Sequence, residues 1–571
     1  MNIAARVSGP AVNKPASVIA LCLLLLSACG GGSGGGDTAP PVTPPPALPQ
    51  SFIASGPSNI APGCTGGRTV GTVFIDSEVE PFVAVAPASG NHLVGAWQQD
   101  RASDGGARAL ISALSLDGGR SWQRTLHPMS RCGGAVAGSA GDYERATDPW
   151  VDIGPDGTVY MMGLAFSGVS FSAGSSNAML ASRSLDGGRT WLGPVALQRD
   201  GASAFNDKNT LTADPTDAQF VYAIWDRLDT VGNGPTLLAR SVDGGASWQA
   251  TQVIYTPTKL GGVSQTIGNR IVVLTDGAER GVLVNVFTQI DTAGSTSTSS
   301  VRVMRSTDKG LTWSPPITVA TRQSVGTRDP VTGELIRDGA VVPTITTGLG
   351  GAIWVAWQDS RFTGGARDAI AVARSTDGGR TWSTPVAVNR DPSVAAFTPT
   401  LHMRADGTVA LMHYDLRSNT PSTATLLGDL WLLTSRDGVN WTETALSRAF
   451  DIGIAPNLPR GRFLGDYHGL VSAGNTFIPF VSLPGTGASN RSDIFAMRVD
   501  VASSVSRVPL ESPAGYQQAQ NSHVARTAPI RTADGDDAAL ARAQSAAIGQ
   551  AMEWRIPGWR ERVTRPAPAP P

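Results

Sequence analysis

The chain has 571 residues, of which 41% are hydrophobic and 16% are charged, and its formal net charge is −1. This length suits one large repeat domain with tails, and this hydrophobic content is ample for a core. Because Lys and Arg do not cluster and the charges nearly cancel, we expect no nucleic-acid partner and no strongly charged partner surface.

The first 28 residues have the pattern of a bacterial export signal. Two basic residues precede an apolar run at residues 18–26, which is too short to span a bilayer stably. The sequence Leu26-Ser27-Ala28-Cys29 resembles the lipobox of bacterial lipoproteins, which implies cleavage before Cys29 and acylation of its thiol. Gly30 rather than Asp follows, so the resemblance implies anchoring in the outer membrane or at the cell surface. A plain signal peptide with a chance cysteine is the alternative.

Residues 29–66 are expected to form a tether. A Gly-rich run at residues 30–36 is followed by a Pro-rich stretch through Pro49. Of the four cysteines, one leaves with the signal and Cys29 carries the lipid, so Cys64 and Cys132 remain. Two remaining cysteines in an oxidising envelope often pair. A disulfide and two free thiols both stay open.

Residues 67–500 have the pattern of an all-β domain. Short runs rich in Val, Ile and aromatic residues are broken by turn residues every 8–12 positions, and no helical periodicity occurs before the tail. One four-strand unit is predicted at residues 80–86, 92–98, 108–115 and 122–126. The first strands of later units are expected to begin near Asp148, Lys208, Asn269, Val341, Thr398 and Asp466.

One turn motif repeats through this region, first as Ser115-Leu116-Asp117-Gly118-Gly119-Arg120-Ser121-Trp122. Its Asp can accept backbone N–H groups within the turn, its Gly residues tolerate positive φ, and its Trp can wedge between sheets. Copies lie at residues 184–191, 241–248, 306–313, 375–382 and, one residue shorter, 435–441, with their Asp residues 57 to 69 positions apart. This spacing is typical of a repeated supersecondary unit.

The motif resembles the Asp-box (BNR) repeat of sialidases and related β-propellers. The resemblance implies a propeller in which the boxes are structural corners away from the ligand pocket. Seven first strands predict seven blades, with six as the alternative. The last unit has no box, so we expect the spare strand at residues 69–75 to complete it and close the ring.

The tail, residues 501–571, loses the strand pattern. Its composition predicts a largely disordered segment with one short helix at about residues 537–553.

Candidate ligand residues should gather at the propeller edge opposite the boxes, where second strands end and first strands begin. Aromatic-Asp-Arg sequences at several of these ends form either a ligand-binding ring or ion pairs between blades. The candidate binding side chains at this edge are Arg101, Arg145, Arg270, Arg361, Asp466 and His468.

Sialidases use a Tyr nucleophile backed by a Glu, an Asp acid/base and three Arg that hold the substrate carboxylate. Tyr467 and Asp104 resemble this Tyr and this Asp in their placement, and Glu80 or Asp466 could back the phenol. The first strand reads Glu80-Pro81-Phe82 where the family has Arg-Ile-Pro, so one carboxylate-binding Arg is missing.

Two functions therefore remain open. One is an envelope-anchored, monomeric sialidase-like glycoside hydrolase acting on terminal acidic sugars. The other is a non-catalytic propeller that binds a glycan or a protein. No zinc, nucleotide or serine-hydrolase motif occurs in the sequence, so we expect no metal and no cofactor.

Overall fold

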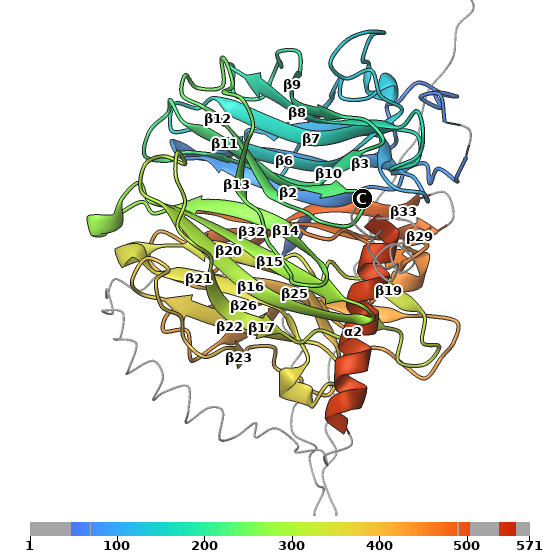
Figure 1. The fold of residues 1–571 in the computed structure, drawn as a ribbon, viewed down its shortest axis with the longest axis vertical. Helices are drawn as coiled ribbons and strands as arrows, with labels where there is room; N and C mark the ends of the chain where they lie inside the picture. Colours follow the sequence, from blue (N-terminus) through green and yellow to red (C-terminus); the bar gives the residue numbers. More distant parts are fainter. Residues whose placement is uncertain (1–46, 69, 488–489, 503–535, 556–571) are drawn as a thin grey trace, which may run out of the picture. The chain divides into compact units, whose positions relative to one another are not determined.

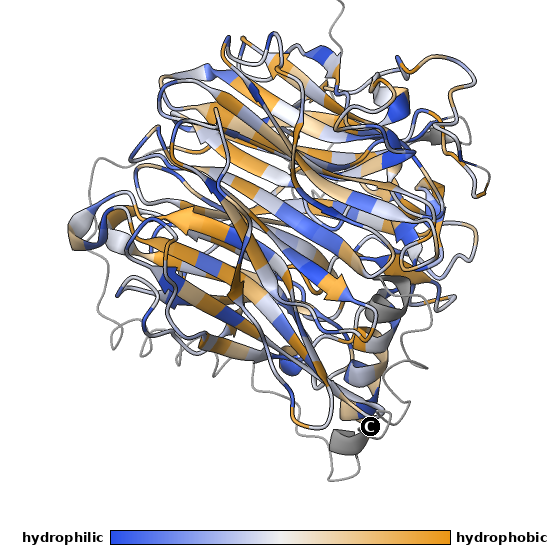
Figure 2. Ribbon diagram, turned by 45° about the horizontal axis from the view of Figure 1, so that its top comes forward, coloured by the Kyte–Doolittle hydropathy of each residue, from blue (hydrophilic) through white to orange (hydrophobic). Residues whose placement is uncertain are grey.

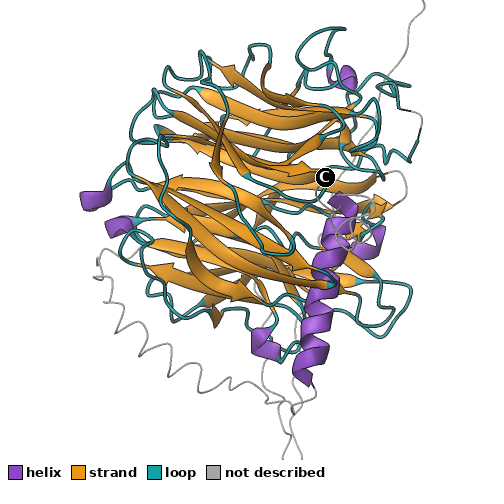
Figure 3. Ribbon diagram, viewed as in Figure 1, coloured by secondary structure: helices purple, strands orange, loops and turns teal. Residues whose placement is uncertain are grey.

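The computed structural model describes residues 47–68, 70–487, 490–502 and 536–555. The predicted signal peptide, Cys29 and the Gly-rich run lie outside these residues. Almost all regular structure in the described part is β-strand (Figure 3). The strands form antiparallel four-stranded sheets, which is consistent with a β-propeller.

Six of these sheets are simple up-and-down meanders, each with an Asp-box between its third and fourth strands (Figure 1). A single pairing of Ala107 with Ala146 joins the first two. Their strands are β2 (Val79–Ala86), β3 (Ser89–Arg101), β4 (Ala107–Ser115) and β5 (Gln123–Leu126); β6 (Arg145–Ile153), β7 (Val159–Ser167), β8 (Ser176–Ser184) and β9 (Val195–Asp200); β10 (Ala204–Ala213), β11 (Val221–Asp229), β12 (Thr236–Ser241) and β13 (Gln252–Tyr255); β14 (Val263–Val273), β15 (Leu283–Ala293), β16 (Thr296–Ser306) and β17 (Ile317–Arg322); β20 (Thr344–Thr347), β21 (Ile353–Asp359), β22 (Ala369–Ser375) and β23 (Val386–Ala387); and β24 (Ala396–Met403), β25 (Val409–Asp415), β26 (Leu427–Ser435) and β27 (Thr442–Ala445). The short β28 (Phe450–Asp451) also pairs with β26.

The last sheet is completed from the N-terminal side, but by a different segment from the one expected. It contains β31 (Gly469–Ala473), β32 (Thr476–Gly487), β33 (Asn490–Asp500) and, outermost, β1 (Gln50–Ile53). The prediction of residues 69–75 as the closing strand was therefore wrong, and the sheet body begins near residue 50 rather than at 67. Residues 70–75 instead cross the end of the first sheet, where Phe74 N donates to Arg101 O. Because β1 follows the edge of β33, it satisfies backbone groups that would otherwise stay open.

The Asp-box turns have the local chemistry predicted from their residues. In the first box, Asp117 Oδ1 accepts the backbone N–H groups of Arg120 and Ser121, each at 2.9 Å. Trp122 lies against Phe480 of the last sheet, with ring centroids 5.1 Å apart. Each box is thus a hydrogen-bonded corner whose ring packs on the neighbouring sheet.

We call β2, β6, β10, β14, β20, β24 and β31 the inner strands, because each contacts the next in this order. Five of them share an irregularity at one position. Non-glycine residues there have positive φ in four strands, at Glu80 (53°), Asp148 (51°), Lys208 (47°) and Thr398 (50°), and Gly268 (69°) occupies the fifth. The sheet register shifts at each of these positions, so each is a β-bulge. A bulge re-aims its side chain, and here it turns charged groups toward the ends of neighbouring inner strands.

Neighbouring inner strands are also joined by side chains that bond to the next backbone. Threonine hydroxyls supply most of these bonds, either as donors or as acceptors. The pairs are Thr210 Oγ1 with Asn269 O (2.9 Å), Thr212 Oγ1 with Ile271 O (2.9 Å), Leu401 N with Thr344 Oγ1 (3.2 Å) and Met403 N with Thr346 Oγ1 (3.0 Å).

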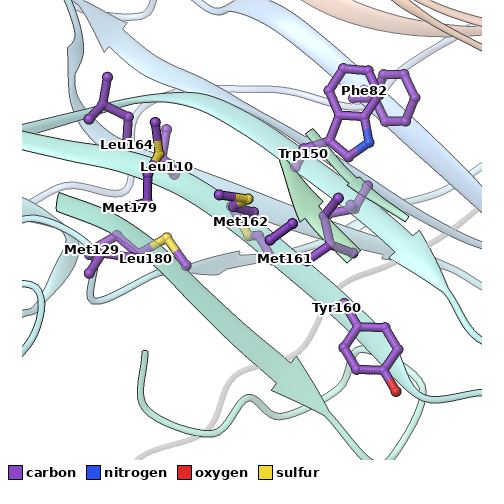
Figure 4. Packing of buried hydrophobic residues seen from close by; sticks show 14 of the residues in the cluster. Phe82, Leu110, Met129, Trp150, Tyr160, Met161, Met162, Leu164, Met179 and Leu180 are labelled. Carbon is purple, nitrogen blue, oxygen red and sulfur yellow. The ribbon is translucent and has the colours of Figure 1, made fainter. Parts of the chain in front are cut away.

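The core lies between adjoining sheets, where apolar residues alternate with polar ones along the strands (Figure 2). The largest cluster fills the space between the first three sheets. In it Phe82 stacks on Trp150 with ring centroids 3.6 Å apart, beside Leu110, Met162 and Leu180 (Figure 4).

The described residues also contain a small sheet, short 3-10 helices and the helix α2 outside the meanders. A small sheet combines β18 (Thr327–Arg328) and β19 (Leu335–Arg337) with β29 (Asn457–Leu458) and β30 (Gly461–Phe463), and β19 pairs with β30 in parallel. In the part of the chain that the structure describes, five short 3-10 helices connect strands: Arg131–Gly133, Gly277–Glu279, Leu349–Gly351, Arg361–Thr363 and Ile452–Ile454. The predicted tail helix is present as α2 (Asp536–Arg555), beside β16 (Figure 1). Neither α2 nor any shorter helix of the described chain has the length and apolar character needed to cross a bilayer.

Candidate functional site

Two bulged inner strands and the residues just before β31 bring three carboxylates together around Lys208. Its Nζ lies 3.1 Å from Glu80 Oε1, 3.2 Å from Asp148 Oδ1 and 2.7 Å from Asp466 Oδ2. All four residues are buried, with exposed fractions of 7% or less. We call Glu80, Asp148, Lys208 and Asp466 the ion cluster.

Two arginines adjoin the ion cluster from outside the inner strands. Arg337, on β19 of the small sheet, makes a two-pronged ion pair with Asp466. Arg101, at the end of β3, donates to Gln98 Oε1 at 2.5 Å, and Gln98 in turn donates to Glu80. Both guanidinium groups lie over the ring of Phe463, at 4.2 Å for Arg337 and 4.8 Å for Arg101. Three cations thus face three carboxylates, and the buried charges balance.

Burial and pairing shift these groups in opposite directions. Burial raises the pKa of Asp148 to about 6, with Lys208 opposing the shift and Glu80 adding to it. Burial also disfavours ionised Asp466, but Arg337 and Lys208 outweigh it and hold the pKa of Asp466 well below its usual range. Burial would lower the pKa of Lys208, yet its three carboxylates raise it above its ordinary value. Lys208 is therefore a fixed cation and not a nucleophile.

Tyr467 lies next to the ion cluster, as the sequence predicted, but its phenol is already engaged. Its hydroxyl donates to Pro149 O at 3.1 Å, and Lys208 Nζ lies 5.6 Å from its ring centroid. Burial raises the pKa of Tyr467 well above its usual value, and the carboxylates of Glu80, Asp148 and Asp466 add to the shift. A backbone carbonyl cannot take the phenolic proton, so this arrangement does not activate a nucleophile.

A cavity of about 480 Å³, a volume that includes space open to solvent, adjoins Tyr467 among the inner strands. Trp150 and Tyr467 supply aromatic surface, and Lys208 and Arg270 supply positive charge. The remaining lining comes mainly from Asn209, Thr210, Gly268, Val342, Pro343, Thr344, Pro399, Thr400, Asp466 and His468.

Arg270 is the distinctive charge in this cavity. Its guanidinium carbon lies 5.4 Å from the centroid of the Phe82 ring and 5.2 Å from that of Trp150. Its hydrogen bond to Thr344 Oγ1 is long, at 3.4 Å, and no carboxylate oxygen of the described residues lies within 4.0 Å of it. Burial lowers its pKa to about 10, with Asp152 opposing, so Arg270 is charged at neutral pH.

Asp104 and Arg145 lie together, but with partners other than the ion cluster. Arg145 Nη1 pairs with Asp104 Oδ2 at 2.7 Å, and Arg68 pairs with the other carboxylate oxygen. Among the described residues, no hydrogen bond or ion pair joins Asp104 to Tyr467 or to the ion cluster. The Asp104 carboxylate, on the loop after β3, is thus held between the guanidinium groups of Arg68 and Arg145.

The aromatic-Asp-Arg sequences form ion pairs, some within a sheet and some between sheets. Arg361 makes a two-pronged pair with Asp359 of its own strand, at 2.8 Å for both contacts. Arg227 on β11 instead reaches Asp200 at the end of β9, at 2.6 Å, and so joins neighbouring sheets. These contacts support the structural interpretation of the motif.

His468 is buried at the rim of the cavity. Burial lowers its pKa to about 3, with Asp466 opposing, and its Nδ1 accepts the backbone N–H of Ser482 at 3.4 Å. The ring is therefore neutral at ordinary pH. Within the described ranges, no group of three or more His, Cys, Asp or Glu side chains is arranged to hold a metal ion.

Sequence reasoning missed Lys208, Arg337 and Trp150 as members of this region. Lys208 had a usable signal, since it starts an inner strand at the position that Glu80 and Asp148 occupy in theirs. No sequence signal indicated Arg337, because this residue lies in an insertion between two sheets. The two cysteines left open by the sequence form a disulfide, Cys64–Cys132, with Cα atoms 5.8 Å apart.

No protein-family model and no curated protein sequence matches this chain. Among solved structures, a Hadza microbial sialidase is 17% identical, with a TM-score of 0.38 over 59% of this chain and 63% of its own. The NanB sialidase of Streptococcus pneumoniae is 9% identical, with a TM-score of 0.41 over 80% and 99%. The α-L-arabinofuranosidase Arb93A of Fusarium graminearum is 12% identical, with a TM-score of 0.37 over 62% and 93%. At these scores the likeness carries no argument about the site.

The agreement with the sialidase-like superfamily comes from the chain itself. Six Asp-boxes occupy the corresponding turn of six successive meanders. This is the arrangement that the resemblance implied.

Proposed function

We propose that this protein is a non-catalytic, glycan-binding β-propeller of the sialidase-like type, with seven blades. In this proposal the protein is held at the bacterial envelope by acylated Cys29, and it binds the carboxylate of an acidic sugar in the cavity beside Arg270. The envelope location depends only on the sequence of the first 29 residues.

Contacts between inner strands support seven blades. Each inner strand contacts the next in the order β2, β6, β10, β14, β20, β24 and β31, and β31 contacts β2 again. That cyclic order uses one inner strand from each of the six meanders and β31 from the last sheet.

We infer the class of ligand from the surroundings of Arg270. A charged guanidinium with no carboxylate oxygen of the described residues within 4.0 Å, beside two aromatic rings in a cavity, is suited to a planar anion next to an apolar group. An acidic sugar offers both features, because its carboxylate can meet Arg270 while its ring contacts the parts of Trp150 and Tyr467 that line the cavity.

The geometry favours binding over hydrolysis. Tyr467 donates to a backbone carbonyl, and Asp104 is paired with Arg68 and Arg145. The cations nearest Tyr467 are matched by the carboxylates of the ion cluster. Tyr467 is therefore not placed to lose its phenolic proton, and Asp104 is not free to act as the acid.

Titration calorimetry with N-acetylneuraminic acid and glucuronic acid tests the proposal. We expect binding by the mature protein and a loss of roughly tenfold or more in affinity for Arg270→Gln, since a charge-assisted pair is removed. The control is Arg448→Gln, an exposed arginine remote from the cavity lining. Equal affinity in both variants would show that Arg270 is not the anchor.

Hydrolysis remains the second candidate because Tyr467, Glu80 and Asp466 do meet at one place. Incubation with aryl glycosides of acidic sugars distinguishes the two. We expect no release of the aryl group. Turnover that disappears in Tyr467→Phe would establish the hydrolase instead.

A further inference from the structure

A second hollow lies beside α2, and Arg270 is not part of its lining. It has a volume of about 1280 Å³, including space open to solvent. One wall is α2, through Ala543, Ala546 and Ala547, and the other consists of loops around Val325–Gly333, Gly365–Arg367 and Ser393–Ala395, with Leu416. We call this space the α2 groove.

The helix is held in place by contacts on its other face. Ile548 is 3% exposed and packs with Leu228, Ile267 and Val341. Ser545 Oγ donates to Ser295 O at 3.0 Å and accepts from Ser297 N at 2.8 Å. These contacts hold α2 beside the strands of two sheets (Figure 1), and its alanine residues line one wall of the groove.

The groove carries two arginines without ion pairs. The Arg328 side chain donates to Gly333 O (3.3 Å) and to Gln550 Oε1 (3.4 Å), and Arg367 donates to Pro392 O at 3.1 Å. Neither guanidinium lies within 4.0 Å of a carboxylate among the described residues. Asp329 supplies the acidic side chain among the described residues of the groove lining, and it already accepts from Val331 N and Thr332 Oγ1.

The groove continues beneath α2. A neighbouring hollow of about 480 Å³ shares Val325, Gly326 and Ala547 with it and extends to Val341. The next residue, Val342, lines the cavity that contains Arg270. The first two hollows share three lining residues and therefore form one continuous groove beside α2.

We propose that the α2 groove binds an extended acidic glycan chain, with Arg328 and Arg367 holding successive carboxylates and α2 completing the site. Its length favours a chain over a single sugar, and its charge is complementary to a polyanion. The proposal does not depend on Arg270, because the groove has its own arginines.

The test compares hexagalacturonate with monomeric galacturonate by calorimetry at constant ionic strength, on the whole mature protein. We expect the doubly substituted Arg328→Gln, Arg367→Gln variant to lose roughly tenfold or more in affinity for the hexamer, with monomer binding unchanged. Arg270→Gln should affect the monomer instead, so the two proposals fail separately. Unchanged hexamer binding in the double variant would overturn this one.

A helix variant tests the role of α2 without removing it. Ala546→Glu places a carboxylate on an exposed position of the groove wall, and Ala541→Glu places one on an exposed position of the same helix outside the lining. We expect only Ala546→Glu to weaken hexamer binding. Equal effects of both, or equally tight binding of hexaglutamate in place of the glycan, would contradict the proposal.

Discussion

Single residues explain why the centre of this molecule can be so highly charged. A lysine buried alone would be very costly, but Lys208 has three carboxylates within 3.2 Å. The bulges at Glu80, Asp148 and Lys208 aim these side chains at one another. Removing one carboxylate leaves Lys208 with two partners, whereas removing Lys208 leaves three carboxylates with the two adjoining arginines, of which Arg337 is paired to Asp466.

Asp148 should leave a signature in the pH dependence of stability. Its folded pKa of about 6 lies above the unfolded value of about 3.9, so the folded state holds its proton more tightly. The stabilisation that this pKa difference adds to the unfolding free energy is fully present below about pH 3.9 and is lost as the pH rises through about 6. We expect Asp148→Asn to reduce the fall in unfolding free energy between pH 4 and 6, by up to about 1.4 kcal/mol per pH unit.

Urea unfolding at several pH values measures this slope. Asp152→Asn is a matched comparison, because burial also raises the pKa of Asp152 to about 6 although no lysine pairs with it. An unchanged slope in both variants would mean that neither carboxyl takes up a proton in that range.

The charged residues at the ends of inner strands could be found from the sequence only in part. Tyr467, Glu80 and Asp466 start strands that the repeat spacing locates, so their meeting follows from topology. Which charges pair does not follow, because bulge conformation and the insertion carrying Arg337 have no local signal. Asp104 was assigned from its loop alone, and Arg68, its second partner, comes from a distant segment.

At the scale of elements, local signals were reliable and long-range pairing was not. All six box turns lie where the motif predicts them, because each is stabilised by its own side chains. The closing strand was assigned to the wrong segment because residues 70–75 look as strand-like as β1. The two segments differ in which one pairs with the edge of β33, and β1 is the one that does.

The disulfide attaches the segment after β1 to the connection between the first two meanders. It closes a loop with a sequence separation of 68 residues. We expect the double variant Cys64→Ser, Cys132→Ser to lose about 2–4 kcal/mol in unfolding free energy, since the cross-link restricts the unfolded chain. Urea unfolding of the variant and of reduced wild type should agree. Equal stability of oxidised wild type and variant would contradict this.

At the scale of the whole molecule, β1 decides whether the last sheet has a free edge. A chain beginning at residue 54 keeps the disulfide and loses only β1, whereas one beginning at residue 48 keeps both. We expect the shorter chain to unfold several degrees lower and to self-associate through β33, because an unpaired edge recruits other strands. Calorimetry and light scattering measure both effects, and identical behaviour of the two chains would contradict the expectation.

Pairing of β1 with β33 also constrains the order in which the protein can mature. The ribosome makes residues 50–53 first, yet their hydrogen-bonding partners at residues 495–498 arrive some 440 positions later. Until then the early strand lacks its neighbour, so the last sheet cannot be completed while the chain is still being synthesised. A chain that is released whole before it folds, as an exported polypeptide is, avoids that delay.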